Sequence, residues 1–293
     1  MVPVTHPPEH SAPASPRTPS EGARPAPRLI ATDLDGTLLR NDKTVSDRTV
    51  AALAAAEAAG IEVFFVTGRP ARWMGVVSDH VHGHGLAICA NGAAVVDLHA
   101  GRRVVRVREL TRADAVAVVE ALRTVTPGLS FAVERTEGIH YEPHYPHFPG
   151  DPGASYAPVE ELLTDSDEGH FAEPVVKLLA HHPTMDPDEF LALGRKAAGA
   201  HAEFTRSSPS ALLEISGHGV SKASTLALAC AERGIGPEQV VAFGDMPNDL
   251  AMLSWAGTSY AMANAHPDVL MCTTHTTASN EDDGVAKVIE GLL

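Results

Sequence analysis

The amino-acid sequence predicts an α/β protein with a parallel-sheet core, helices on both faces of the sheet, and an inserted α+β module. Short apolar runs without polar alternation, such as 61–66 and 240–245, are typical of strands that are buried on both faces. A helix-like segment follows each run, as parallel strands require. Between about 108 and 211 strand and helix patterns no longer alternate in this way, which predicts the insertion.

The core is expected to begin at Arg28. Residues 1–27 are rich in proline, alanine and serine without periodicity, which predicts a disordered tail. The next elements are expected to be a strand at 29–32, a helix from its cap Ser46 to Ala59 with Gly60 behind it, a strand at 61–66, a helix opened by Pro70, and a strand at 86–90. Asn91 and Gly92 stop that strand, since this dipeptide favours a turn.

A hairpin at 94–110 around Ala100 and Gly101 is expected to lead into the inserted module. The module is expected to contain a helix at 111–123, strands at 130–134, 174–180, 202–206 and 211–215, a helix near 186–198, and a proline-broken loop at 140–158. The core then continues with a helix at 220–234, a strand at 240–245, a helix at 248–257, a last strand and its loop at 258–265, and a final helix at 283–293. These elements divide the chain into a tail (1–27), a core (28–107 and 212–293) and an insertion (108–211).

The composition disfavours several functional classes. A formal net charge of −15 opposes binding to nucleic acid or to an anionic membrane surface, and no basic run overrides it. No apolar stretch approaches 18 residues, and the amino terminus lacks the apolar core of a signal peptide. Cys89, Cys230 and Cys272 form no C-x-x-C pair, which is typical of buried thiols in a reducing compartment. We therefore expect a cytoplasmic protein without nucleic-acid, membrane or obligate protein partners.

Two aspartates end the first predicted strand, in the segment ATDLDGTLLRND (31–42). Asp33 and Asp35 are two residues apart, so their carboxylates leave the strand on the same side, at the edge of a parallel sheet where ligands bind. A simple turn at Asp35 and Gly36 would explain part of this pattern. Crowded carboxylates repel each other, and a divalent cation such as Mg²⁺, which prefers hard oxygen ligands, would relieve the repulsion.

Other strand ends and helix starts supply groups that suit a phosphoryl group. A hydroxyl and backbone N–H groups at a helix start favour an anion, and further carboxylates favour a cation beside it. These groups are Thr67, Gly68 and Arg69 after the second strand, Asp245, Asn248 and Asp249 after the strand at 240–244, and Lys222 at a helix start. The carboxyl ends of parallel strands meet at one edge of the sheet, so we expect these groups to converge there.

These segments resemble the motifs of the haloacid dehalogenase-like phosphohydrolases, and in particular those of the Cof-like branch. The matching segments are DLDGTLL (33–39), VTGR (66–69), GVSK (219–222) and GDMPND (244–249), with NG (91–92) and NEDDGVA (280–286) as further matches. The resemblance extends from Arg28 to the end of the chain. It implies a Rossmann-like core and places the insertion where this branch carries an α/β cap.

The resemblance further implies a Mg²⁺-dependent phosphatase of a small phosphorylated metabolite, either a sugar phosphate or a phosphorylated cofactor. Asp33 would attack phosphorus and form an aspartyl phosphate, while Asp35 would protonate the leaving group and then deprotonate water. The implied metal ligands are the carboxylates of Asp33 and Asp245 and the backbone carbonyl of Asp35. Asp249 would orient Lys222 or a metal-bound water. The implied catalytic and phosphate- or substrate-binding residues beyond these are Thr67, Gly68, Arg69, Asn91, Lys222 and Asn248.

Three other functions remain open on the sequence alone. A phosphomutase-type phosphotransferase would use the same aspartyl phosphate with a second sugar as acceptor. A phosphoaspartate signalling protein is disfavoured by Asp35, since an acid/base group beside the nucleophile shortens the lifetime of the phosphoryl group. A non-catalytic sugar-phosphate binder is disfavoured because every catalytic position is filled. The sequence lacks G-x-G-x-x-G, G-x-x-x-x-G-K-[ST] and H-E-x-x-H, the motifs of dinucleotide, P-loop and zinc-protease sites.

Side chains of the inserted module are expected to contact the substrate. The candidates are Glu134, His140, Tyr141, His144, Lys177 and Glu214. The spacing of His140, His144 and His147 also suits zinc, but the prolines between them oppose a regular helix and no fourth ligand is evident. Trp73 and Trp255 are expected to pack against the sheet.

Overall fold

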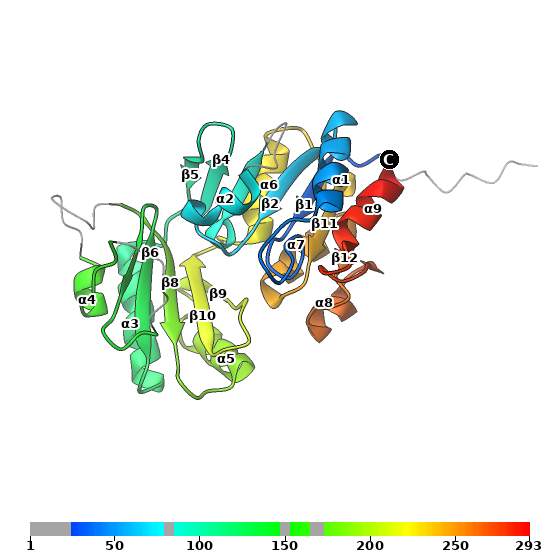
Figure 1. Ribbon diagram of the computed structural model, residues 1–293. Helices are drawn as coiled ribbons and strands as arrows, with labels where there is room; N and C mark the ends of the chain where they lie inside the picture. Colours follow the sequence, from blue (N-terminus) through cyan, green and yellow to red (C-terminus); the bar gives the residue numbers. More distant parts are fainter. Residues whose placement is uncertain (1–24, 79–84, 147–152, 165–172) are drawn as a thin grey trace, which may run out of the picture.

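The computed structural model describes residues 25–78, 85–146, 153–164 and 173–293 (Figure 1). Most of the predicted tail at 1–27 lies outside the described residues, as does His147. Within the described residues the chain forms two sheets, one of eight strands and one of five. Figure 1 shows them in two separate lobes, with the middle of the chain forming the smaller one.

The eight-stranded sheet has the strand order β13-β12-β11-β1-β2-β3-β4-β5. Its strands are β1 (Leu29–Thr32), β2 (Glu62–Val66), β3 (Leu86–Cys89), β4 (Ala94–Asp97), β5 (Arg103–Val107), β11 (Val240–Gly244), β12 (Thr258–Ala261) and β13 (His275–Thr276). All neighbours from β13 to β3 pair in parallel, and β4 and β5 add an antiparallel edge. Every residue of β1 is buried, so both faces of the sheet are covered at its centre.

Helices connect these strands and cover the sheet. They are α1 (Asp47–Ala58), α2 (Gly75–Ser78), α6 (Lys222–Ala231), α7 (Leu250–Trp255), α8 (Pro267–Cys272) and α9 (Gly284–Leu292), with 3₁₀ turns η1 (Ala71–Trp73), η2 (Ala90–Gly92), η3 (Pro237–Gln239) and η4 (Pro247–Asp249). Helix α1 packs against α9, and α6 packs against α7. The Ser46 side chain accepts a hydrogen bond from the Thr49 amide, which confirms the predicted start of α1.

The five-stranded sheet is antiparallel and has the order β7-β6-β8-β10-β9. Its strands are β6 (Ser130–Arg135), β7 (Ile139–Tyr141), β8 (Val175–His181), β9 (Ala202–Thr205) and β10 (Leu212–Gly217), and its helices are α3 (Arg112–Val125), α4 (Val159–Leu162) and α5 (Pro187–Ala198). Helices α3 and α5 pack together, and residues such as Leu122, Phe131 and Phe190 fill a core separate from that of the larger sheet.

Several predicted boundaries are wrong. The core segment was expected to resume at 212, but residues 212–217 form β10 inside the five-stranded sheet. The strand predicted at 211–215 was assigned to the inserted module, as observed, so the error lies in the boundary, which was placed at the start of this strand instead of after it. Strand β7 occupies 139–141, where the sequence predicted a loop. The strand at 258–261, β12, is not the last one, because β13 follows α8 in the chain and pairs with β12.

The helix expected from Pro70 is also irregular. The chain forms the 3₁₀ turn η1 and then the short helix α2, and the described residues break off after Ser78. Over the described parts of the chain, no helix combines the length and the apolar character needed to cross a membrane.

Candidate active site

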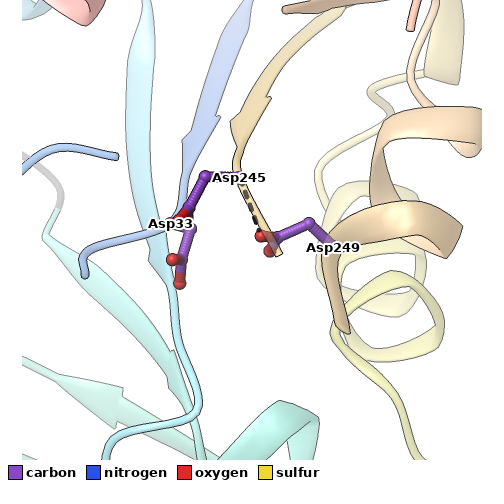
Figure 2. A group of neighbouring side chains, drawn as sticks. All are labelled: Asp33, Asp245 and Asp249. Carbon is purple, nitrogen blue, oxygen red and sulfur yellow. Dashed lines mark hydrogen bonds between the residues drawn. The ribbon is translucent and has the colours of Figure 1, made fainter. Parts of the chain in front are cut away.

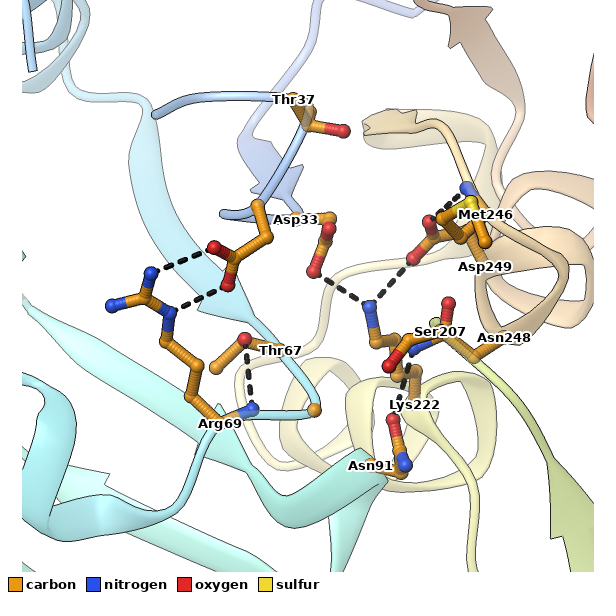
Figure 3. Close-up of polar contacts among 12 residues, drawn as sticks. Asp33, Thr37, Thr67, Arg69, Asn91, Ser207, Lys222, Met246, Asn248 and Asp249 are labelled. Carbon is orange, nitrogen blue, oxygen red and sulfur yellow. Dashed lines mark hydrogen bonds and ion pairs between the residues drawn. The ribbon is translucent and has the colours of Figure 1, made fainter. Parts of the chain in front are cut away.

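The site forms where β1, β2 and β11 end at the same edge of the larger sheet (Figure 3). Asp33 follows β1, Thr67 follows β2 and Asp245 follows β11. Strand β1 pairs in parallel with β11 on one side and with β2 on the other, so three segments far apart in sequence deliver their side chains to one place. The predicted convergence of these strand ends is therefore observed.

Asp33 has one carboxylate oxygen bound and one free. The Lys222 ammonium donates to Asp33 Oδ1 at 2.6 Å, and Lys222 itself is almost completely buried. Among the described residues no donor reaches Asp33 Oδ2, although Asp33 lies on the wall of a cleft. A carboxylate held rigidly by one oxygen and open at the other is suited to attack an electrophile in that cleft.

Lys222 also binds a second carboxylate. Its ammonium donates to Asp249 Oδ1 at 2.7 Å, and Asp249 Oδ2 accepts the backbone N–H groups of Asp245 and Met246 at 3.1 and 3.0 Å. Burial would lower the pKa of Lys222, but the charges of Asp249 and Asp33 outweigh it and raise the pKa above its usual value. Because both Asp249 oxygens are occupied, Asp249 is placed to hold Lys222.

Three buried carboxylates crowd together at this edge (Figure 2). Oxygen atoms of Asp33, Asp245 and Asp249 all lie within 4.8 Å of one another. Burial raises the pKa of Asp245 to about 7, the charge of Asp249 adds to the rise, and a hydrogen bond from Thr37 at 2.8 Å partly opposes it. Burial likewise raises the pKa of Asp33 well above its usual value, against the charge of Lys222. One ammonium beside three carboxylates leaves this group short of positive charge.

The cluster fits a hard divalent cation. Asp33 and Asp245 each keep an oxygen outside the hydrogen bonds described above, and carboxylate oxygens are the ligands that Mg²⁺ prefers. Gly36 makes room for this arrangement, because a Cβ there would overlap Asp245 Oδ2 and lie 2.9 Å from Asp245 Cγ. The backbone of Gly36, with φ of +75°, also lies in the region that favours glycine.

We expect Gly36→Ala to weaken Mg²⁺ binding and reduce activity at least about tenfold, because the new methyl group displaces the Asp245 carboxylate. The matched control is Gly60→Ala. Gly60 has φ of +82° but nothing within 4 Å of an added Cβ, so it shares the backbone strain, about 1 kcal/mol, without the collision. Titration of Mg²⁺ against both variants separates the two effects. Equal affinities in the two variants would contradict the assigned role of Asp245.

Asp35 does not belong to the carboxylate cluster. Its oxygens accept Arg69 Nε and Nη2 at 2.5 and 2.7 Å and Lys43 Nζ at 2.8 Å. Burial would raise the pKa of Asp35, but the hydrogen bonds from Arg69 and Lys43 outweigh it and lower the pKa to about 2. The contact of the Asp35 backbone carbonyl with a metal stays a prediction from the family resemblance.

The predicted phosphate-binding residues occupy two positions. Thr67, Gly68, Arg69 and Asn248 line the cleft, and the Thr67 hydroxyl accepts the backbone N–H of Arg69 at 3.0 Å. Asn91 and Lys222 do not line it, and Lys222 is buried against Asp33 and Asp249. Asn91 is buried, and its side-chain amide is bound to Glu214 and Asn248, which do line the cleft.

The cleft has a volume of about 570 Å³ and lies between the two sheets. Its wall from the smaller lobe includes the predicted candidates Glu134, Tyr141, Lys177 and Glu214. An apolar part is formed by Trp73, Ile139, Tyr141, Tyr145, Leu179 and Leu212. The prediction that Trp73 packs against the sheet is wrong, because its side chain is 47% exposed on the cleft. Nothing in the sequence distinguishes this tryptophan from a core residue.

The histidines of the smaller lobe lie elsewhere. His140 and His144 are not among the residues that line the cleft, and His140 Nδ1 accepts the Ser155 amide at 3.2 Å. His147 is outside the described residues. Within the part of the chain that the structure describes, the group of acidic, histidine and cysteine side chains placed to share a metal is the aspartate cluster.

Comparisons with known proteins find chains that are similar over most of this sequence. A family model described as haloacid dehalogenase-like hydrolase matches residues 30–289. The 5-amino-6-(5-phospho-D-ribitylamino)uracil phosphatase YitU of Bacillus subtilis (strain 168) is 29% identical, over 90% of this chain and 97% of its own length. The pyridoxal phosphate phosphatase YbhA of Escherichia coli (strain K12) is also 29% identical, over 91% and 98%.

The fold recurs in solved structures. The crystal structure of SMU.1108c from Streptococcus mutans UA159 superimposes with a TM-score of 0.77, at 21% identity, over 91% of this chain and 98% of that one. At this level of identity the likeness concerns the fold.

Proposed function

This chain belongs to the haloacid dehalogenase-like hydrolase family, and from that premise we propose that it is a Mg²⁺-dependent phosphatase of a small phosphorylated metabolite. One observation carries the proposal. Asp33 lines a cleft and has one carboxylate oxygen that no described donor reaches, while Lys222 holds its other oxygen beside a carboxylate cluster that fits Mg²⁺. Transfer of a phosphoryl group to a carboxylate requires such a nucleophile, together with positive charge that stabilises the transferring group.

In the proposed reaction Asp33 Oδ2 attacks phosphorus, the bond from phosphorus to the ester oxygen breaks, and the alcohol leaves with a proton. Water then attacks the phosphorus of the aspartyl phosphate, which releases inorganic phosphate and restores Asp33. Thr67, Arg69 and Asn248, which line the cleft, and Lys222 beside Asp33 would bind the phosphoryl oxygens.

Asp35 is proposed as the group that moves protons. In the observed arrangement Arg69 and Lys43 hold it ionised, and its lowered pKa makes it a weak base until these contacts loosen. To donate a proton to the leaving group it must first lose these contacts. A substrate phosphate that binds Arg69 would compete for them, since phosphate and carboxylate are alternative bidentate partners of a guanidinium group.

Mg²⁺ would be held by the carboxylates of Asp33 and Asp245 and by the backbone carbonyl of Asp35, while Asp249 orients Lys222. When bound, the cation would neutralise negative charge on the carboxylates and on the phosphoryl group. Binding of the cation would be driven by relief of the repulsion between these buried carboxylates.

We expect Mg²⁺ affinity to rise with pH up to about 7 and to level off above it. The pKa of Asp245 is raised to about 7, so below that pH a proton competes with the cation, at a cost of up to about tenfold in affinity per pH unit. Since the ordinary pKa is 3.8, this group also makes the metal-free protein less stable as pH rises from about 4 to about 7.

The check is the increase in melting temperature caused by Mg²⁺ between about pH 5.5 and pH 8.5. The control is Asp245→Asn, which should bind Mg²⁺ weakly and lose the part of the pH dependence that comes from Asp245. A wild-type affinity that is constant over this range would contradict the prediction.

The substrate is proposed to be a sugar phosphate or a phosphorylated cofactor. The two curated relatives named above are phosphatases of a ribitylaminouracil phosphate and of pyridoxal phosphate. The apolar and aromatic part of the cleft wall, with the exposed Trp73, supports a leaving group that carries a ring, as in a cofactor. A cytoplasmic location is part of the proposal, supported by three cysteines that form no disulfide.

The test is release of inorganic phosphate from sugar phosphates, nucleotides, pyridoxal phosphate and flavin mononucleotide, with Mg²⁺ and with EDTA. We expect release that requires Mg²⁺ from one class of compound. Isomerisation of a sugar phosphate in the presence of a bisphosphate, without release of phosphate, would instead establish the phosphomutase alternative.

A further inference from the structure

A buried ion pair that the proposed chemistry does not use joins the two sheets. Lys177 of β8 and Glu214 of β10 are both buried, and Lys177 Nζ donates to Glu214 Oε2 at 2.9 Å. Glu214 pairs across the sheet with Leu179, two residues from Lys177, so both charged side chains leave the same face. That face is the one that forms the cleft wall.

Both members of this pair also bind the larger lobe. Lys177 Nζ donates to the carbonyl of Gly68 at 2.8 Å, and Asn91 Nδ2 donates to Glu214 Oε2 at 2.7 Å. Asn91 Oδ1 in turn accepts Asn248 Nδ2 at 3.1 Å (Figure 3). The network thus runs from the smaller lobe to two segments that line the cleft beside Asp33.

The turn that carries Asn91 is itself tied to the site. Ala90 and Asn91 have φ of +50° and +55°, an unfavourable conformation for alanine. The backbone N–H of Asn91 donates to the Thr67 carbonyl at 3.0 Å. A Cβ at Gly92 would collide with the carbonyl of Ser221, the residue before Lys222. The strained backbone at Ala90 and Asn91 persists only because the surrounding contacts stabilise it.

We propose that Lys177 and Glu214 are positioning residues for the phosphatase reaction. By binding Gly68 and Asn91, the pair docks the smaller lobe on the larger one and fixes Asn248 and the segment 67–69 around the phosphoryl group. This inference rests on the proposed function. Charge is expensive to bury, and an apolar pair of similar size would stabilise the fold at least as well, so stability alone does not account for the pair.

Three variants test the role. Lys177→Met leaves Glu214 buried without its counter-charge. Glu214→Gln leaves Lys177 buried without its counter-charge but keeps a side-chain oxygen that can accept the hydrogen bond from Asn91. The double variant Lys177→Met/Glu214→Gln buries no charge. We expect each single variant to lower both kcat and the melting temperature, and the double variant to recover the melting temperature while kcat stays at least about tenfold below wild type. The assay measures hydrolysis of p-nitrophenyl phosphate with Mg²⁺.

A purely structural role predicts otherwise. In that case kcat of the double variant would recover together with its melting temperature, and this result would overturn the proposal. Asn91→Gly is the second test, because glycine accepts the positive φ and removes the bond between Asn91 and Glu214, one of the two links between the lobes, without uncovering a charge. We expect its kcat to fall about tenfold with KM changed less; a kcat within about twofold of wild type would also overturn the proposal.

Amide hydrogen exchange, which does not depend on catalysis, separates this inference from the proposed function. Wild-type protein that releases no phosphate would refute the function, whatever the variants do. Amide hydrogen exchange at 67–69 and 90–92 then decides on the docking. Faster exchange in the single variants supports it, and unchanged exchange refutes it.

Discussion

Replacing Asp33 by asparagine is expected to reduce phosphate release by at least about 10⁴-fold with the fold intact. The amide has the shape of the carboxylate but lacks its negative charge and is a far weaker nucleophile at this position on the cleft wall. Lys222 still binds Asp249, so no buried charge loses its partner.

The same change should leave the metal-free protein as stable as wild type or more stable. Burial raises the pKa of Asp33 well above its usual value, so the ionised carboxylate costs free energy in the fold that a neutral amide does not. Kinetics and melting temperature, both compared with Asp47→Asn on the exposed first turn of α1, are the checks. Activity within about tenfold of wild type would refute Asp33 as the nucleophile.

Replacing Lys222 by methionine is expected to abolish activity and to lower the free energy of unfolding by about 3–5 kcal/mol near neutral pH. The change leaves Asp33 and Asp249 buried without the ammonium that binds both. Urea unfolding measures the loss. In this variant the two carboxylates have raised pKa values, so they take up protons more readily in the folded state, and stability should recover as pH falls.

Lys222→Arg is the matched variant. It keeps the charge, but the site is closed around a side chain that is only 1% exposed, so the larger guanidinium group cannot bind both carboxylates as the ammonium does. We expect a smaller loss of stability and a comparable loss of activity. Full activity in either variant would show that Lys222 binds no transferring oxygen.

Much of the core could be predicted from the sequence because its signals are local. The buried strands β1, β2 and β11 read as apolar runs, and the polar residues after each run identified the edge where the site forms. The helix cap at Ser46 was equally clear. Strand ends in a parallel sheet converge by topology alone, so convergence of the aspartates followed from element order.

The remaining features depend on contacts between distant segments. The insertion ends only after β10, a boundary set by the pairing of β10 with β8 and β9, although the strand itself was predicted as part of the module. The side-chain partners of Asp35 also escaped prediction. Asp35 is held by Arg69 and Lys43 instead of joining the cluster, a matter of side-chain placement. Asn91 was expected to bind substrate, but Glu214, more than a hundred residues away, occupies its amide.

The most direct test of the proposed chemistry is to find the phosphoryl group on Asp33. Trypsin releases the segment 29–40, since it cleaves after Arg28 and after Arg40, the last residue of the segment. The Asp35→Asn variant, in which attack by water should be slow, is mixed with p-nitrophenyl phosphate and Mg²⁺, quenched in acid and reduced with borohydride, which converts an aspartyl phosphate into homoserine. Peptide mass spectrometry should locate homoserine at position 33, and Asp33→Asn and EDTA should abolish it. Release of p-nitrophenol without modification of Asp33, or with modification of another residue, would contradict the mechanism.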